Sequence, residues 1–353
     1  MSRESGWAAI NLEKPERIPR TEYSAHFHWE LIKKVTGIDV DQHSDPKTQQ
    51  KASNAFVKAW DYGFMWNIWA HSHNCFGGFY TKMGHAAYAA GGVDFSAEVN
   101  CPFSDPEEVL NFRPTEKFGK IDKADVLRKI NEDYRMNLEN YSDTVCMTGT
   151  YISCFSGLIE LFGWEMLLLA AGMDADGFGK VAEDYGKFIM QYYEVLGQSD
   201  SPVIMIHDDL CWTSGPVVAP EWYRRYVFPV LKKAATLLRD CGKKVLFTSD
   251  GNYTEFIDDL AGCGMQGFVL EPTTDMGYIA EKYGKTHVIV GNADTRILLS
   301  GSKEEIEREV KRCIGIGKDC PGYFMAVGNH IPPNTPVGNA LYYDEMYRKY
   351  SRR

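Results

Sequence analysis

Three short apolar runs in the C-terminal half constrain this chain more than any other feature. They cover residues 245–247, 267–270 and 288–290, and amphipathic helical stretches separate them. Runs of this length are typical of strands buried on both faces, and their alternation with helices is typical of a parallel sheet. Because such strands present their carboxyl ends on the same side, the polar residues after each run are expected to converge.

The same alternation extends over the whole chain. Strands are predicted near residues 21, 63, 143, 203, 245, 267, 288 and 323. Eight strands alternating with helices predict a (β/α)8 (TIM) barrel, to which we add an N-terminal helical and aromatic cap. A doubly wound open sheet is the alternative, but no glycine-rich nucleotide loop follows any strand. We treat 1–353 as one barrel domain, with 28–140 contributing helices and loop insertions.

Charge and composition exclude several classes of partner. The formal net charge of −10 at pH 7 argues against nucleic acid and against anionic membrane surfaces. No apolar run of about 18 residues suggests a membrane-spanning helix, and the N-terminus lacks the apolar core of a signal peptide. The nine cysteines form no Cys-x-x-Cys pair, which indicates reduced thiols and a cytoplasmic protein.

Polar side chains follow most of the predicted strands, where a barrel of this kind places its active site. Glu271 follows an apolar run directly, and a carboxylate at a buried strand end needs a partner or a task. Adjacent strand residues point to opposite faces, so at most one of Asp208 and Asp209 is expected to face the barrel mouth. The candidates are His26, His28, His207, Asp208, Asp209, Asp250, Glu271, Asn292, Asp294 and His330.

A metal site is one interpretation of these residues. Asp250, Glu271 and His330 would offer two carboxylates and an imidazole, a ligand set suitable for zinc with an open coordination position. The three come from separate strands, so their spacing in the sequence cannot decide the question. For Asp250, Asn292 and Asp294 the structural alternative is helix capping, which Asp and Asn side chains do routinely.

Aromatic side chains are dense between residues 66 and 88. Long loops with this content often cover a pocket, although the same rings could simply belong to the core. The segment contains Trp66, Trp69, His71, His73, Phe76, Phe79, Tyr80, His85 and Tyr88.

Most of the chain resembles a known superfamily, and the resemblance is most specific over residues 200–340. The resemblance covers about residues 12–340 and implies a (β/α)8 barrel, because the uroporphyrinogen decarboxylase superfamily has that fold. The superfamily includes true decarboxylases and corrinoid-dependent methyltransferases. The matching residues are Gly291-Asn292-Ala293-Asp294, Leu298, Gly301, Glu304-Glu305-Ile306, Gly322-Tyr323 and His330-Ile331-Pro332-Pro333-Asn334-Thr335-Pro336.

Within the superfamily, the resemblance favours the methyltransferases. The decarboxylases carry an arginine-rich motif in the first strand for the porphyrinogen carboxylates, whereas this strand offers only Arg20. Members that methylate a thiol carry His-x-Cys after the fifth strand, Glu after the sixth and Cys after the last. Here Asp250, Glu271 and Asn329 or His330 stand at those positions, so only the glutamate is kept.

The resemblance therefore implies an O-demethylase methyltransferase. Such an enzyme moves a methyl group from a methoxylated, often aromatic, small molecule to the Co(I) of a separate corrinoid protein. An ether is inert, so a Lewis acid or a proton donor must stabilise charge on the leaving oxygen. We predict His207, Asp208, Asp209 and Asp250 as catalytic residues, His26, Trp66, Tyr80, Trp212, Asn292 and Asp294 as substrate-binding residues, and Asp250, Glu271 and His330 as zinc ligands.

Three alternatives remain open at this point. The first is another methyltransferase of the superfamily, acting on a methylamine, methanol or a methylated thiol. The second is a decarboxylase with a substrate other than a porphyrinogen, and the third is a binding paralogue without catalysis. A homodimer is compatible with the sequence.

Overall fold

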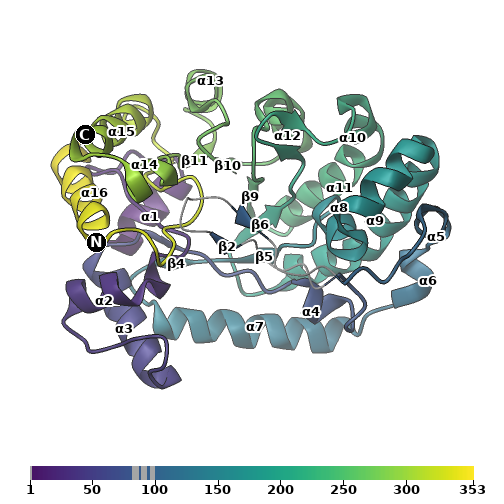
Figure 1. The fold of residues 1–353 in the computed structure, drawn as a ribbon, viewed down its shortest axis with the longest axis horizontal. Helices are drawn as coiled ribbons and strands as arrows, with labels where there is room; N and C mark the ends of the chain where they lie inside the picture. The colour runs from purple at the N-terminus through teal and green to yellow at the C-terminus, as the bar shows by residue number, and fades with distance from the viewer. Residues whose placement is uncertain (1, 82–86, 89–93, 96–99) are drawn as a thin grey trace.

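Parallel strands surrounded by helices form the body of the computed structural model, which describes residues 2–81, 87–88, 94–95 and 100–353 (Figure 1). Six strands form one parallel sheet in the order β12-β11-β10-β9-β6-β5. Their bounds are Thr148–Thr150 for β5, Val203–His207 for β6, Lys244–Thr248 for β9, Gly267–Val269 for β10, Val288–Val290 for β11 and Tyr323–Phe324 for β12.

Two short links close this sheet into a ring. β1 (Phe64–Met65) pairs in parallel with β4 (Val145–Cys146), which leads directly into β5. Arg20 forms parallel bridges with Tyr62, just before β1, and with Met325, just after β12. The predicted (β/α)8 barrel is confirmed, but its first strand is reduced to this bridge. The chain turns into the 3-10 helix η1 at residues 25–27 instead of continuing as a strand.

Side chains that alternate along the strands fill the barrel, as the two-residue period of a strand requires. One interior cluster holds Phe64, Val145, Met147, Val203, Met205, Leu246, Val288, Val290, Phe324 and Ala326. Their neighbours along the strands belong to a second cluster that includes the surrounding helices. Helix α1 (Ser2–Ile10) closes the amino-terminal end, where a Cβ on Gly6 would lie 2.0 Å from the Gly63 carbonyl oxygen.

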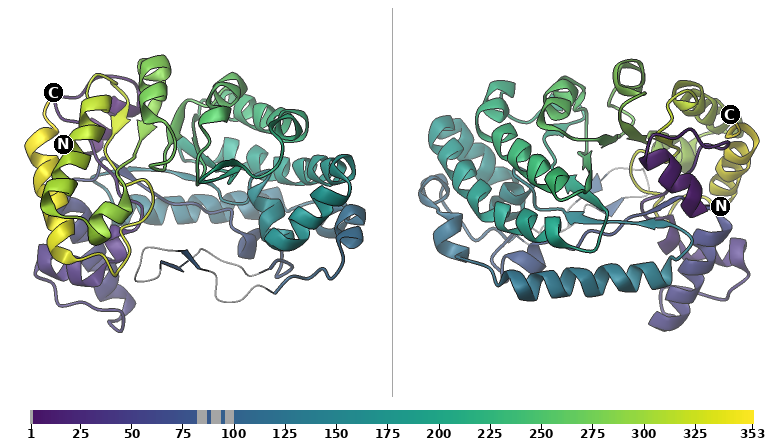
Figure 2. Two further views of the ribbon diagram at one scale, coloured as in Figure 1. Left: turned by 45° about the horizontal axis from the view of Figure 1, so that its top comes forward. Right: turned by 180° about the vertical axis from the view of Figure 1, so that it is seen from behind.

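The remaining helices cover the outside of the barrel. Both chain ends lie on one side of the molecule, beside α16, in all views (Figures 1 and 2). From α8 onward the helices are α8 (Ser156–Met173), α9 (Ala175–Gln198), α10 (Pro220–Tyr226), α11 (Phe228–Asp240), α12 (Ile257–Cys263), α13 (Met276–Tyr283), α14 (Thr295–Ser300), α15 (Lys303–Gly317) and α16 (Val337–Tyr350).

The N-terminal part adds helices that lie outside the ring of strands. The long helix α7 runs along one edge of the molecule (Figure 1). These helices are α2 (Trp29–Thr36), α3 (Pro46–Ala59), α4 (Ser72–Cys75), α5 (Pro106–Asn111), α6 (Pro114–Phe118) and α7 (Lys123–Asn140). In the same part, strand β2 (Ala87–Tyr88) pairs antiparallel with β3 (Asp94–Phe95). After β6, strand β7 (Cys211–Trp212) pairs antiparallel with β8 (Gly215–Pro216).

Helix α8 is the element to compare with the expectation that no helix spans a membrane. Among the residues that the structure describes, it alone is long and apolar enough to cross a membrane, with a mean hydropathy of 1.3 over 18 residues. Just over half of it, 56%, is buried inside the protein. The helix is also kinked at Gly163, whose φ of 69° and ψ of 165° are not helical. Buried core helices pass the same test of length and composition.

Candidate active site

A pocket opens at the carboxyl ends of the strands. The space between its walls is about 610 Å³, counting the part open to solvent. Most of the lining residues lie on the inward side of the strands, as do the residues that fill the barrel interior. The lining residues are Tyr23, Trp66, Ile68, Tyr151, Met205, His207, Thr248, Asp250, Val269, Val290, Ala326, Val327, Gly328, Asn329 and His330.

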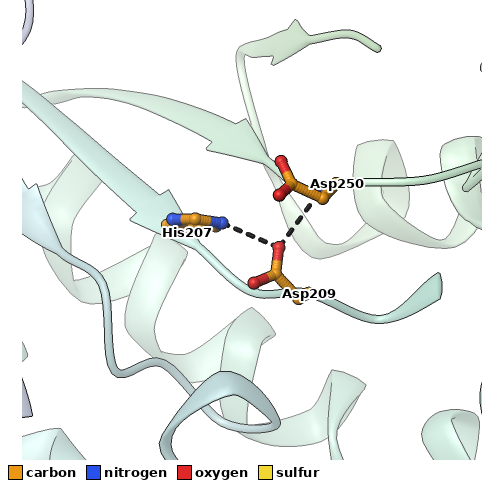
Figure 3. Close-up of side chains that lie close together, drawn as sticks. All are labelled: His207, Asp209 and Asp250. Carbon is orange, nitrogen blue, oxygen red and sulfur yellow. Dashed lines mark hydrogen bonds and ion pairs between the residues drawn. The ribbon is translucent and has the colours of Figure 1, made fainter. Parts of the chain in front are cut away.

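His207, Asp209 and Asp250 form a cluster at one side of this pocket. The Nε2 atom of His207 lies 2.7 Å from Asp209 Oδ1, and the Asp250 N–H donates to the same oxygen at 3.0 Å (Figure 3). Strands β6 and β9 pair with His207 opposite Thr248, so Asp250, two residues further on, lies on the same inward side. One ligand atom from each of the three lies within 4.8 Å of the others, and among the described residues this group could hold a metal ion.

The imidazole of His207 is charged at neutral pH. Burial lowers its pKa, but the negative charges of Asp209, Asp250 and Asp208, together with the hydrogen bond to Asp209, outweigh burial and raise the pKa to about 9. A protonated imidazole held against a carboxylate can donate a proton to a developing oxyanion. The pair His207–Asp209 is therefore suited to general acid chemistry.

Aromatic rings form the walls of the pocket. Tyr23 lies 5.9 Å from Trp66 and meets His330 edge-on at 4.7 Å between ring centroids. Tyr151 meets His207 edge-on at 4.1 Å. Flat apolar walls of this kind favour a ring-shaped ligand.

Asp208 does not line the described pocket, and its place among the catalytic residues stays a prediction. Its Oδ1 accepts the N–H groups of Phe155 and Ser156, each at 2.7 Å, so it anchors the start of α8. Burial raises the pKa of Asp208 to about 7 even though these two hydrogen bonds lower it. Of the two adjacent aspartates, Asp209 is the one beside His207, in keeping with the alternation of side chains along a strand.

Glu271 connects loops at the barrel mouth by hydrogen bonds. Its Oε2 accepts the Gly251 N–H at 2.8 Å, and its Oε1 accepts the Asn329 side-chain amide at 2.5 Å. These bonds connect the tips of β9, β10 and β12. Within the described part of the chain, the ligand atoms that come together belong to His207, Asp209 and Asp250. Of the predicted zinc ligands, Asp250 belongs to this group, and zinc binding by Glu271 and His330 stays a prediction.

Of the six predicted substrate-binding residues, five do not line this pocket in the described structure, among them His26, Tyr80 and Trp212. His26 lies in η1 and packs edge-on against Tyr141, and burial lowers its pKa to about 3. Tyr80 is half-buried and is not among the residues that line this pocket. Trp212 lies in the β7–β8 hairpin, is 45% exposed and contacts Trp164 at 5.6 Å between ring centroids. Trp66 is the predicted aromatic residue that does line the pocket.

Asn292 and Asp294 serve the local structure beside the barrel mouth. The Asn292 amide donates to two backbone carbonyl groups, and its own oxygen accepts from Arg312 at 3.0 Å. Asp294 caps helix α14 and pairs with Arg296 at 2.7 Å. For Asp294 the structure has the helix cap that was the alternative, and substrate binding by either residue stays a prediction.

Sequence reasoning missed Tyr23 and Tyr151, which both line the pocket. Tyr151 follows Met147 and Gly149 on the inward side of β5, so continued alternation along that strand would have identified it. The side chains of His85 and Tyr88, which were expected near the pocket, lie outside the described residues.

Comparison with known proteins gives matches in family and in fold. A family model described as uroporphyrinogen decarboxylase (URO-D) matches residues 87–350. The uroporphyrinogen decarboxylases of Syntrophotalea carbinolica and Geobacter sulfurreducens are each 27% identical, over 151 and 164 residues. These alignments cover 43% and 46% of this chain, and 42% and 46% of those relatives, so the chain matches less than half of their length.

A solved structure extends the likeness to the whole chain. The structure of a methyltransferase from Methanosarcina mazei superposes with a TM-score of 0.65 at 17% sequence identity. The superposition covers 99% of this chain and 98% of that one. At this level of identity the match shows a shared fold over the full length.

Proposed function

The chain belongs to the uroporphyrinogen decarboxylase (URO-D) family, and we propose that within this family it acts as a methyltransferase. The donor is a methoxylated aromatic small molecule, and the acceptor is the Co(I) of a separate corrinoid protein. The observation that carries this proposal is the His207–Asp209 pair beside a pocket with aromatic walls.

The charges of the pocket argue against a porphyrinogen substrate. A molecule with many carboxylates requires several cationic partners, above all arginine. The described lining of the pocket contains neither Lys nor Arg. Arg20, the one arginine of the first strand position, is fully buried between Glu22 and Asp344 at 2.9 and 2.5 Å, and it is not a lining residue.

Cleavage of an ether requires stabilisation of the leaving oxygen. Co(I) attacks the methyl carbon, the bond between carbon and oxygen breaks, and its electron pair stays on the oxygen. The His207–Asp209 pair supplies the proton that this oxygen takes up, so the products are an alcohol or phenol and methyl-Co(III). Positioned proton donors of this kind contribute about 10²- to 10⁴-fold to the rate.

Zinc is the metal that the donor set suits. His207 Nε2 and one oxygen each from Asp209 and Asp250 would hold it and would leave one position open. When bound, zinc supplies Lewis acidity to the leaving oxygen. Its binding requires that His207 lose its proton, because a metal ligand must present a free electron pair, so zinc would act in place of proton donation by His207 and not together with it.

The test of this function is formation of methylcobalt from methyl ethers. The purified protein is mixed with a reduced corrinoid protein and a panel of phenyl methyl ethers, and the absorbance change of cobalt methylation is followed. His207→Gln should abolish the change, and Asp240→Asn, an exposed carboxylate on α11, should leave it unaltered. Methylation from methanol, methylamine or a methyl thiol alone would indicate a different donor. Release of carbon dioxide without corrinoid would indicate a decarboxylase.

A further inference from the structure

We infer that Tyr23 contacts the methyl donor directly and that its hydroxyl donates a hydrogen bond to the oxygen that leaves the methyl group. This inference rests on the proposed function and assigns a second donor in the same pocket. It makes Tyr23 a catalytic residue beside His207, with a contribution that grows as charge develops on the leaving oxygen.

The backbone at the first strand position turns Tyr23 toward the interior of the barrel. Arg20 and Glu22 lie on the outer side, where their side chains pair at 2.9 Å. On that side the Tyr343 hydroxyl of α16 donates to Glu22 Oε1 at 2.9 Å. Because side chains alternate along an extended chain, Thr21 and Tyr23 lie on the opposite, inner side. The buried ion pair therefore fixes the backbone next to Tyr23, and Tyr23 lines the pocket.

Two neighbouring rings hold the phenol of Tyr23 in the pocket wall. Its centroid lies 5.9 Å from that of Trp66 and 4.7 Å from that of His330, which it meets edge-on. Both neighbours line the pocket as well. Because the ring is packed on two sides, the position of its hydroxyl is set before a ligand enters.

The hydroxyl of Tyr23 makes no hydrogen bond to another described residue. Buried tyrosine hydroxyls usually find a partner inside the protein, as Tyr253 does by donating to the Val269 carbonyl oxygen at 2.6 Å. Tyr62 also has a hydroxyl without a partner among the described residues, but that oxygen is sealed from solvent. Tyr23, in contrast, lines the pocket, so its hydroxyl is available to a ligand.

Tyr23 and Asp250 enter the pocket from opposite sides of the barrel. Going round the ring of strands from Arg20, β9 is reached after β1, β4–β5 and β6 in one direction, and after β12, β11 and β10 in the other. The Tyr23 hydroxyl is still within electrostatic range of the other side, because its pKa is raised by burial and further by Asp250 and Asp209. A ring bound between the two sides can present one oxygen to both His207 and Tyr23.

A second donor has a defined role in ether cleavage. As the bond between the methyl carbon and oxygen breaks, its electron pair stays on the oxygen, and negative charge develops there. The Tyr23 hydroxyl keeps its own proton and donates a hydrogen bond to this oxygen, which has lone pairs for two partners. The same hydrogen bond is available when zinc replaces proton donation by His207. Donors aimed at developing charge raise kcat more than they raise the affinity for the substrate.

Tyr23→Phe tests this role, because it removes the hydroxyl and keeps the ring. The substrates are 4-methylanisole, whose phenolate is a poor leaving group, and 4-nitroanisole, whose phenolate leaves more readily. With 4-methylanisole we expect kcat for methyl transfer to fall by about 10²- to 10³-fold and KM to stay within about twofold. With 4-nitroanisole the loss should be at least about tenfold smaller, because its leaving oxygen needs less stabilisation. Equal losses with the two ethers, or no loss, would overturn the inference.

A matched variant controls for removal of a tyrosine hydroxyl. Tyr342 lies on α16, and its hydroxyl is 3.5 Å from Glu307 Oε2, so Tyr342→Phe should change neither rate. Because the Tyr23 hydroxyl has no partner among the described residues, Tyr23→Phe should unfold at the same denaturant concentration as the wild type. A lower unfolding midpoint for Tyr23→Phe would assign the hydroxyl a structural role and contradict the inference.

Ligand binding provides a readout without corrinoid or turnover. The 4-nitrophenolate ion carries the charge that the leaving oxygen develops, and 4-nitrotoluene has a methyl group in place of that oxygen. Tyr23→Phe should weaken binding of the phenolate about tenfold or more, since a hydrogen bond to a charged oxygen is lost. It should leave the affinity for 4-nitrotoluene within about twofold. Equal phenolate affinity in the two proteins, or no phenolate binding by the wild type, would overturn the inference.

These measurements separate the role of Tyr23 from the proposed function. Phenolate binding that depends on Tyr23, without methyl transfer from any ether, would support the contact and refute the methyltransferase. Methyl transfer from phenyl methyl ethers that Tyr23→Phe does not slow would keep the methyltransferase and overturn the assignment of Tyr23.

Discussion

His207 Nε2 and Asp209 Oδ1 lie 2.7 Å apart at the tip of β6, and neighbouring elements hold both residues in place. The N–H of Asp209 donates to Ser156 Oγ at 2.7 Å, which ties the carboxylate to the start of α8. The Asp250 N–H donates to Asp209 Oδ1 at 3.0 Å from the end of β9. The pair is therefore positioned before any ligand enters, as catalysis by proton transfer requires.

Replacing Asp209 with Asn keeps the shape of the side chain and should leave less of His207 protonated at neutral pH. The carboxylate is the nearest of the charges that raise the pKa of His207, so that pKa should fall. We expect kcat/KM for methyl transfer to drop by about 10²- to 10⁴-fold. An NMR titration of the His207 ring nitrogens measures the pKa, with Asp240→Asn as the control. Full activity with an unchanged pKa would mean that the pair does not act as proposed.

The pH profile of the metal-free enzyme should have a high-pH limb set by His207. Its pKa is raised from 6.5 to about 9, so the proton is present throughout the neutral range and is lost as the pH rises through about 9. We expect kcat/KM to be level below this value and to fall about tenfold per pH unit above it. Rates between about pH 6 and pH 10, with chelator present, provide the measurement. A fall of kcat/KM that begins near pH 6.5 would show that the pKa of His207 is not raised, and would contradict the prediction.

Zinc binding should distinguish Asp250 from Glu271. Asp250 belongs to the group whose ligand atoms come within 4.8 Å, whereas Glu271 accepts hydrogen bonds from Gly251 and Asn329. We expect Asp250→Asn to weaken zinc binding about 10- to 100-fold or more, and Glu271→Gln to preserve it. Glu271→Gln should instead destabilise the fold by about 1–3 kcal/mol, since one of its two acceptors becomes a donor. Calorimetric titration with zinc measures the affinity, and denaturant unfolding measures the stability. Loss of zinc binding in Glu271→Gln but not in Asp250→Asn would contradict this prediction and favour Glu271 as a zinc ligand, as predicted from the sequence.

Asp208 should make stability fall as the pH rises. Burial raises its folded-state pKa from 3.8 to about 7, so between about pH 4 and 7 the folded protein holds a proton that the unfolded chain has lost. Stability from this group is greatest below about pH 4 and declines up to about pH 7, by at most about 1.4 kcal/mol per pH unit. Asp208→Asn keeps an oxygen for Phe155 and Ser156 and removes the titration. Denaturant unfolding across this window should show a smaller decline in the variant, and an identical decline would refute the assignment.

The barrel was predictable because each strand is a local signal. The apolar runs at residues 245–247, 267–270 and 288–290 coincide with β9, β10 and β11, and helices follow them as expected. The first strand position was harder, because it consists of the bridge at Arg20. A single bridged residue has no periodicity to recognise, and its pairing depends on Tyr62 and Met325, which are distant in the chain.

The amino-acid sequence by itself determined which residues end the strands, and therefore that His207, Asp250 and His330 share one barrel mouth. Only the tertiary structure decided what each polar group does there. Asp208 turns to the helix start, and Glu271 turns to the loops at Gly251 and Asn329. The physical reason is that strand register follows from local alternation. A carboxylate's partner, in contrast, depends on which distant backbone and side-chain donors the folded chain brings within hydrogen-bonding distance.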